Sequence, residues 1–286
     1  MNRFLIKCCL AASFLILHVC LQAQEFKNDA GEKEKHFINQ VKQIDEFFER
    51  FNDDSNSFVR EVYKSYKTKF KIDRKTLIKS LFNYEGKSWN NVLMDSFIKK
   101  AMFVKMPTGK NWYGENWFAE ANCKFQYNSS VIEIPVILRI MTDEKKRSKW
   151  VIIGIKPSPL KERENSRVPI IVRKMKTKFI DPSSHGTNFI ELERDFNDKD
   201  NLSDYFDSTF FYRQNALPFY HSLINHKIKL VSVKDIKYHF LNVDDYIFTV
   251  EYFPRQTLNS GWLISDLKQS TAKQKDIYKR LLLGEQ

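Results

Sequence analysis

The chain of 286 residues carries 47 basic and 35 acidic side chains, and its formal net charge of +12 favours acidic or phosphate-bearing partners. The basic residues are spread along the chain without a nucleic-acid-binding motif, so no nucleic-acid partner is expected. Three of the four cysteines lie within the first 20 residues, which excludes a disulfide framework and leaves the fold to rest on its hydrophobic core.

Residues 1–23 have the pattern of a cleavable secretory signal peptide. Arg3 and Lys7 precede an apolar run over 8–21, which is shorter than the roughly 20 apolar residues that a membrane-spanning helix needs. Ala23 is a small residue directly before a strongly polar stretch, so we expect cleavage to leave Gln24 as the mature N-terminus. The pattern predicts an exported protein of the periplasm or cell envelope, with no transmembrane segment after signal removal.

Two alternatives use the same segment. An uncleaved signal would act as an N-terminal anchor. Lipidation of Cys20 would make a lipoprotein, but the bulky residues His18 and Val19 stand where a small residue is needed. After cleavage Cys123 is the single remaining cysteine, and we interpret it as a small buried hydrophobic residue rather than a nucleophile.

A polar segment over 24–35 is followed by a pattern that predicts helices. Apolar residues recur at alternating spacings of four and three, which places on one helical face Phe37, Val41, Ile44, Phe48 and Phe51. The turn-forming residues after Phe51 are expected to end this helix. A second helical stretch covers 58–66, and a third begins after Asp73, which is a predicted N-cap.

Strands follow the helices. Residues 132–140 alternate between apolar and other side chains, which is typical of a half-buried strand, and a charged turn leads to a second strand over 150–155. Residues 117–127 read as another strand of the same antiparallel sheet. Each final strand is expected to direct alternate residues at the helices of its own half.

The order of elements is then repeated. Phe51-Asn52-Asp53 recurs as Phe196-Asn197-Asp198, and Trp150-Val151-Ile152 is matched by Trp262-Leu263-Ile264. The two offsets differ, which locates an insertion of the first copy within 69–116. We favour an internal duplication over chance matches of common cap and strand residues. All four aromatic landmarks, Phe51, Phe196, Trp150 and Trp262, are expected to be buried.

Helices followed by a bent antiparallel sheet that closes on a Trp-containing strand resemble the NTF2-like superfamily, whose fold is a cystatin-like α+β cone. The predicted fold class is therefore α+β with two NTF2-like copies. The expected organisation is a first domain with the insertion over 36–157, a linker over 158–185, a second domain over 186–268 and a C-terminal helical tail over 269–286. The resemblance implies a pocket between helices and sheet, which in some members holds a catalytic Asp, His or Tyr.

No constellation of residues predicts a catalytic, cofactor-binding or metal site. His221 and His226 fall on different helical faces and lack partners at zinc-like spacing. His239, in an alternating strand, could face the surface or line a pocket. The Ser- and His-containing segment 181–188 is interpreted as a turn and helix cap. The nearby aspartates lack calcium-loop spacing, and Asn201 is predicted to cap a helix.

The densest aromatic stretch contains Trp112, Tyr113 and Trp117. If exposed, these side chains could bind a sugar or a protein partner; if buried, they cover the sheet. The hypothesis for function is an exported, non-catalytic binding or assembly module of the cell envelope, without a cofactor. Its partner would be another envelope protein or an anionic surface. The alternatives are an NTF2-like enzyme with a pocket acid and base, or a basic module that binds anionic envelope surfaces.

Overall fold

The computed structural model describes residues 40–65, 73–107, 116–142, 147–156, 160, 178–213 and 215–285. The first half contains helices α2 (Ile44–Asn52), α3 (Phe58–Ser65), α4 (Arg74–Ser80) and α5 (Asn91–Ala101), then strands β1 (Trp117–Tyr127), β2 (Ser130–Thr142) and β3 (Ser148–Ile155). The second half contains short helices η1 (Pro182–Thr187), α6 (Leu192–Asn197), η2 (Lys199–Tyr205), η3 (Ser208–Tyr212) and α7 (Ala216–Ile224). Strands β4 (Ile228–Phe240), β5 (Tyr246–Phe253) and β6 (Gly261–Gln269) and the helix α8 (Ala272–Leu282) follow. The predicted α+β class is confirmed.

The six strands of the described residues form one antiparallel sheet in the order β3-β2-β1-β4-β5-β6. Strands β1 and β4 pair along their length, from Trp117 opposite Phe240 to Tyr127 opposite Ile228. The two sequence halves therefore contribute adjacent sets of strands to a shared sheet, and the junction between them lies at its centre.

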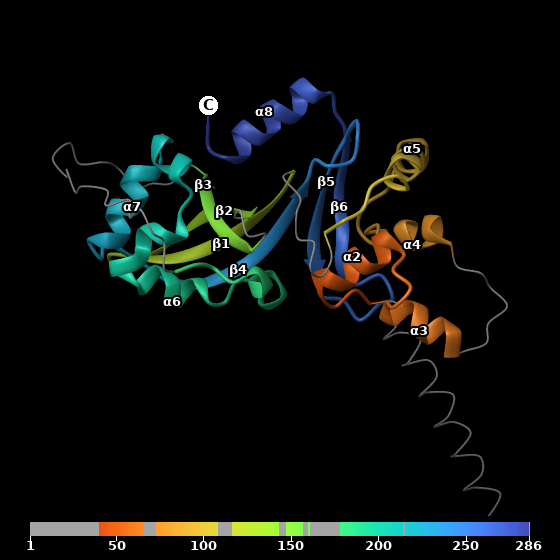
Figure 1. Ribbon diagram of the computed structural model, residues 1–286, viewed down its shortest axis with the longest axis horizontal. Helices are drawn as coiled ribbons and strands as arrows, with labels where there is room; N and C mark the ends of the chain where they lie inside the picture. Colours follow the sequence, from red (N-terminus) through yellow and green to blue (C-terminus); the bar gives the residue numbers. More distant parts are fainter. Residues whose placement is uncertain are drawn as a thin grey trace, which may run out of the picture.

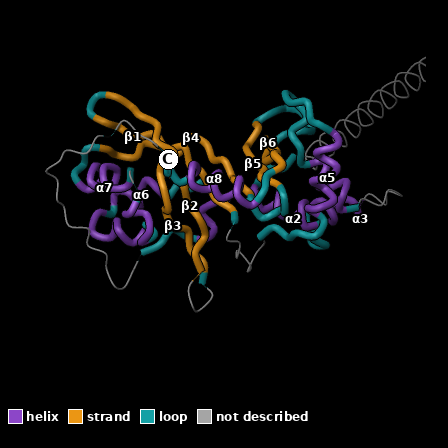
Figure 2. The backbone as a smooth tube through the Cα atoms, turned by 90° about the horizontal axis from the view of Figure 1, so that it is seen from above, coloured by secondary structure: helices purple, strands orange, loops and turns teal. Residues whose placement is uncertain are grey.

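The helices are exchanged between the halves, which corrects the expectation that each final strand packs on the helices of its own half (Figures 1 and 2). On β6, the Trp262 backbone NH donates to the Val41 carbonyl at 2.7 Å, just before α2. On β3, the Trp150 NH donates to the Ile180 carbonyl at 3.1 Å, just before η1. We call α2–α5 the first helical layer and η1–α7 the second. The first layer packs on β5 and β6, and the second packs on β1 and β3 of the other half and on β4 of its own half.

Aromatic packing supplies the physical reason for the exchange. Phe51 of α2 lies flat against Phe248 of β5, with ring centroids 6.1 Å apart. Phe196 of α6 stacks on Phe125 of β1 at the same centroid distance of 6.1 Å. Each layer thus packs aromatic residues on strands of the other half, and a single core of large rings runs beneath both layers.

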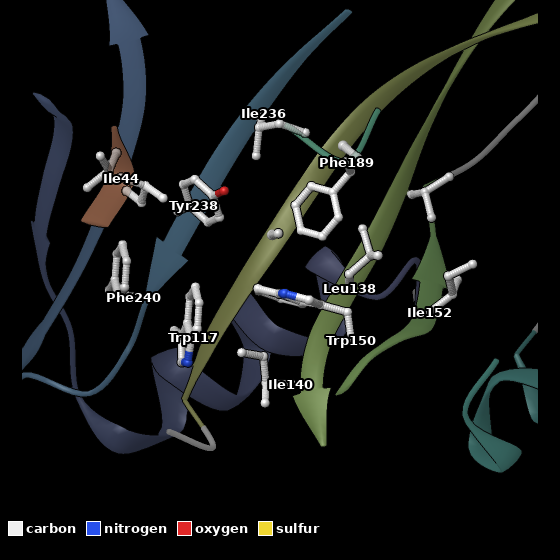
Figure 3. Packing of buried hydrophobic residues seen from close by; sticks show 14 of the residues in the cluster. Ile44, Trp117, Leu138, Ile140, Trp150, Ile152, Phe189, Ile236, Tyr238 and Phe240 are labelled. Atoms are coloured by element: carbon white, nitrogen blue, oxygen red, sulfur yellow. The ribbon is translucent and has the colours of Figure 1, made fainter. Parts of the chain in front are cut away.

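Trp117 lies at the centre of this core (Figure 3). Its ring is parallel to that of Phe240 at 5.8 Å, and it meets Trp150 edge-on at 5.0 Å. Trp150 also contacts Phe189, which follows η1, at 5.1 Å. The predicted burial of Phe51, Phe196, Trp150 and Trp262 is confirmed, since each is at most 4% exposed.

Helix α8 covers the opposite face of the sheet (Figure 1), where a smaller apolar cluster includes Phe118, Ile137, Leu282 and Leu283. Thr271 and Gln274 form a capping box at its start. In the described part of the chain, none of the helices is both long and apolar enough to cross a membrane.

Two predicted caps have different outcomes. Asp73 caps α4 as expected, because its carboxylate accepts a hydrogen bond from the Thr76 NH at 2.8 Å. The prediction that Asn201 caps a helix is wrong. Asn201 lies inside η2, and its side-chain amide donates to Asp198, the residue that precedes η2. η2 already begins at Lys199, so Asn201 does not stand at the helix start.

Candidate functional site

The residues predicted to bind a partner are not brought together in a site. Trp112 and Tyr113 lie outside the described residues, as do Ala23 and Gln24 at the predicted signal cleavage position. Trp117 is 1% exposed, so for this residue the core alternative holds. Its side chain has no free face on which a sugar or a partner side chain could stack.

A cleft of about 310 Å³ opens instead between the C-terminal end of η1 and the strands β4, β5 and β6. We call it the central cleft; its walls come from β4, β5, β6 and the residue that ends η1, and are formed by Asn188, Val233, Lys234, Asp235, Ile236, Glu251, Tyr252, Pro254 and Trp262. Its volume lies at the lower end of the range for small-molecule sites. Every residue of this lining belongs to the second half of the chain, from Asn188 to Trp262.

The central cleft has an aromatic wall and a polar rim. Tyr252 is 50% exposed, and its ring centroid lies 5.5 Å from that of the buried Trp262. On the rim, the Glu251 carboxylate accepts hydrogen bonds from the Ser265 hydroxyl at 2.7 Å and the Lys237 ammonium at 3.1 Å. Lys234 pairs with Glu133 at 3.1 Å. Since the rim charges already have partners, the wall suits a ligand with many hydroxyls better than an ion.

A second polar feature lies beneath α8, on the other face of the sheet. The Tyr278 hydroxyl lies 2.6 Å from His239 Nδ1, and His239 Nε2 lies 2.9 Å from a Glu120 carboxylate oxygen. The Lys156 ammonium donates to the other Glu120 oxygen at 2.5 Å. We call these four residues the buried polar chain. His239 and Glu120 are almost fully buried. The hydrogen bond between Tyr278 and His239 connects α8 to the sheet.

The hydrogen-bond partners decide the protonation pattern of this chain. Burial alone would raise the pKa of Glu120, but hydrogen bonds from His239 and Lys156 outweigh it and lower that pKa to about 2. Burial lowers the pKa of His239, and the opposing effect of Glu120 does not cancel this. Burial raises the pKa of Tyr278. A neutral His239 therefore donates from Nε2 to the Glu120 carboxylate and accepts the Tyr278 proton at Nδ1.

The residues of the buried polar chain satisfy one another's hydrogen-bonding groups, and they lie apart from the central cleft. Glu120, His239 and Tyr278 contribute nothing to the cleft wall. A general acid or base must lie within hydrogen-bonding distance of its substrate. Here each group is already hydrogen-bonded to another residue of the buried polar chain. We therefore interpret the buried polar chain as a structural connection between α8 and the sheet.

The segment that contains His185 also has a structural role. The segment 181–188 forms η1, and Asp181 accepts a hydrogen bond from the Ser183 NH, which confirms the turn-and-cap interpretation. His185 is buried within it, with Nδ1 2.6 Å from the Pro182 carbonyl and Nε2 3.2 Å from Asp45 of α2. Among the described residues, His, Cys, Asp and Glu form no cluster of three that could hold a metal ion.

The buried polar chain leads to a prediction about pH. A pKa lowered in the folded state stabilises the protein above the unfolded pKa, and this contribution disappears as the pH falls towards the folded value. For Glu120, the stabilisation of about 3 kcal/mol should be lost between pH 4.5 and about 2. His239 acts in the same direction below its ordinary pKa of 6.5, because the unfolded chain takes up the proton more readily. Urea unfolding at a series of pH values measures both effects.

The matched comparison is Glu120→Gln against Glu133→Gln, since Glu133 makes a surface ion pair with a side chain that is 49% exposed. Glu120→Gln should be less stable than the wild type at neutral pH, and the two curves should converge as the pH approaches 2. Glu133→Gln should remain close to the wild type throughout. A constant gap between the wild type and Glu120→Gln over this pH range would contradict the prediction.

The sequence analysis missed Glu120, Lys156 and Tyr278. One local signal for Glu120 existed, because a carboxylate stands in an otherwise apolar stretch of β1, Trp117-Phe118-Ala119-Glu120-Ala121. A lone acid in a strand that becomes buried requires a partner.

Comparison of the chain with protein-family models, with curated proteins and with solved structures finds no match.

Proposed function

We propose that the chain is an exported, non-catalytic binding module of the cell envelope, and that its ligand site is the central cleft. The single observation that carries the proposal is the half-exposed Tyr252 beside Trp262, at the floor of a cleft with a rim of Asn, Asp, Glu and Lys side chains. Aromatic rings pack against the C–H faces of sugars, and polar side chains bind hydroxyl groups. The ligand class that fits is a neutral saccharide of one or two rings.

The enzyme alternative has less support. Glu120 and His239 are buried ionisable groups with lowered pKa values, but they face α8 rather than the central cleft. A pocket acid and base would have to line the same cavity as the substrate. Binding without turnover is the function that the position of these groups favours.

Tyr252→Ala tests the saccharide site. Removal of the ring is expected to weaken binding about tenfold, or about 1.4 kcal/mol, because the stacking surface disappears. Neutral oligosaccharides would first be screened on a glycan array, and the strongest binder then titrated by isothermal calorimetry. Tyr252→Phe should retain most of the affinity, since it keeps the ring.

The matched control is Tyr212→Ala, which removes a tyrosine that is 90% exposed and lies outside the cleft. It should bind like the wild type. Absence of binding to any neutral glycan, or equal affinities of Tyr252→Ala and the wild type, would rule out the proposal.

We also infer that the two halves descend from one duplicated NTF2-like unit. Equivalent backbone contacts support this. The Asn83 NH donates to the Ile264 carbonyl at 3.1 Å, and the Asp207 NH donates to the Ile152 carbonyl at 2.9 Å. Both bridges are parallel and lie two residues after the matched Trp262 and Trp150. The bridges next to the tryptophans differ, since that of Gly261 is parallel and that of Trp150 is antiparallel.

Export predicts a specific mature N-terminus. Mass spectrometry of the protein from an envelope fraction should find Gln24 as the first residue, because the small Ala23 precedes the polar stretch. An intact Met1 in that fraction would indicate an anchor instead. A diacylated Cys20 would indicate a lipoprotein.

A further inference from the structure

Two neighbouring apolar side chains are exposed directly after α5, on the outer side of the first helical layer (Figure 1). Met102 is 38% exposed and Phe103 is 90% exposed. We call these two residues the α5 tip. The helix itself buries apolar residues against the core, namely Met94, Phe97, Ile98 and Ala101. An aromatic ring in water is unfavourable, so a ring presented at the surface suits a partner that removes it from water.

The backbone of the α5 tip is fixed by Arg74 of α4. The Arg74 guanidinium donates to the Met102 carbonyl at 2.8 Å and also to the Val104 carbonyl. Just beyond the tip, the Asn52 side chain exchanges two hydrogen bonds with the Met106 backbone, at 2.7 and 2.9 Å. The exposed ring therefore stands on an ordered backbone, and its contact with a partner requires little further ordering of the chain.

Cations surround the α5 tip. Lys99 is exposed on the last turn of α5, and Lys100 beside it is 50% exposed although it pairs with Asp245 at 3.4 Å. Lys105 is exposed as well, and its ammonium donates to a backbone carbonyl at 2.6 Å, a neutral acceptor that leaves the charge in place. The stretch 73–107 carries seven basic and three acidic residues. The α5 tip is thus an apolar point on a positively charged surface.

This combination favours a lipid surface over a protein partner. A stable protein interface buries roughly 800 Å² on each side around a wide apolar centre, which two side chains do not provide. An anionic bilayer requires no such patch, because its headgroups attract lysines and its interfacial region takes up single aromatic rings. Charge complementarity therefore identifies the partner of the α5 tip as a negatively charged membrane surface.

We propose that the α5 tip docks the protein on an anionic phospholipid surface, with the Phe103 ring in the interfacial region and the surrounding lysines at the headgroups. The net charge of +12 attracts the whole chain to the same surface. One ring and a few lysines give reversible attachment rather than permanent anchoring. The contact is independent of the saccharide proposal, since neither residue of the α5 tip lines the central cleft.

Sedimentation with vesicles tests the contact. The chain from Gln24 onward, which contains every described residue, is mixed with vesicles of phosphatidylcholine alone or of phosphatidylcholine and phosphatidylglycerol in equal parts. It should bind the anionic vesicles only, and high salt should weaken this binding. Phe103→Ser should weaken it about tenfold, because no ring enters the interface, and Phe103→Trp should retain it. Lys99→Gln should weaken it about fivefold.

The matched controls lie far from the α5 tip. Tyr212→Ser alters an aromatic residue that is equally exposed, at 90%, in η3 of the second helical layer. Lys229→Gln removes an exposed lysine near the start of β4, whereas the other end of β4 leads to Asn242, which contacts Met106. Both variants should bind anionic vesicles nearly as the wild type does. Circular dichroism confirms that each variant folds.

A fluorescent label locates the ring. Cys123 is buried, so an iodoacetamide derivative of NBD should react with an introduced cysteine instead. The label on Phe103→Cys should become brighter and shift to shorter wavelength with anionic vesicles, and the label on Tyr212→Cys should not. Tyr252→Ala should leave vesicle binding unchanged, which separates this result from the saccharide test. Absence of vesicle binding, equal binding of Phe103→Ser and the wild type, or equal responses of the two labels would overturn the proposal.

Discussion

Trp117→Ala is expected to lower the free energy of unfolding by about 3–5 kcal/mol, which is the usual cost of truncating a fully buried aromatic residue. Trp117 is 1% exposed. Its ring lies 5.0–6.0 Å from four other rings, those of Phe48, Trp150, Tyr238 and Phe240. These rings come from α2, β3 and β4, and β1 pairs with β4, so the cavity would open at the junction of the two halves. Urea unfolding followed by circular dichroism measures the change.

Two companion variants make the result interpretable. The Trp117 ring nitrogen has no hydrogen-bond partner among the described residues, so Trp117→Phe loses volume but no hydrogen bond and should cost less than the alanine variant. Tyr212→Ala, at a residue 90% exposed, should change the free energy by at most about 0.5 kcal/mol. A loss below about 1 kcal/mol for Trp117→Ala would mean that Trp117 is not part of a close-packed core.

Gly261→Ala is the second variant with a large expected effect, because it acts on the contact that holds the first helical layer to β6. Gly261 has a φ of 91°, and a Cβ placed there would lie 2.0 Å from the Val41 carbonyl oxygen. The same carbonyl accepts the Trp262 NH at 2.7 Å. The backbone must therefore move apart, and we expect a loss of about 3 kcal/mol or more from positive-φ strain combined with the broken bridge.

Gly86→Ala is a close control for this substitution. Gly86 has a similar φ of 96°, but a Cβ there meets no atom within 4 Å. Its substitution should cost only the backbone strain, about 1–2 kcal/mol. The difference between the two variants in urea unfolding isolates the clash with Val41. Equal losses would show that β6 and the segment before α2 are not in contact.

Local sequence patterns determined some elements well, but the first helix begins at Ile44, and Val41, which was predicted to lie on its face, forms a backbone bridge to Gly261 instead. The strand predicted over 117–127 coincides with β1, and Asp73 caps α4. These features depend on neighbours a few residues apart, through side-chain alternation and the free NH groups of a first helical turn. The turn after α2 is similar, since Asp53 takes the left-handed conformation that ends the helix.

Tertiary structure alone decided which helices cover which strands and where the polar residues meet. The periodicity of α2 shows that Phe51 faces a core, but both sets of strands offer apolar faces, and the pairing of β1 with β4 brings the other set within reach. The hydrogen-bond partners of His239 are Glu120 and Tyr278, which lie 119 and 39 residues away in the sequence. The central cleft likewise joins Asn188 to Trp262. Burial and hydrogen bonding between distant segments depend on long-range packing, which the spacing of residues along one segment does not encode.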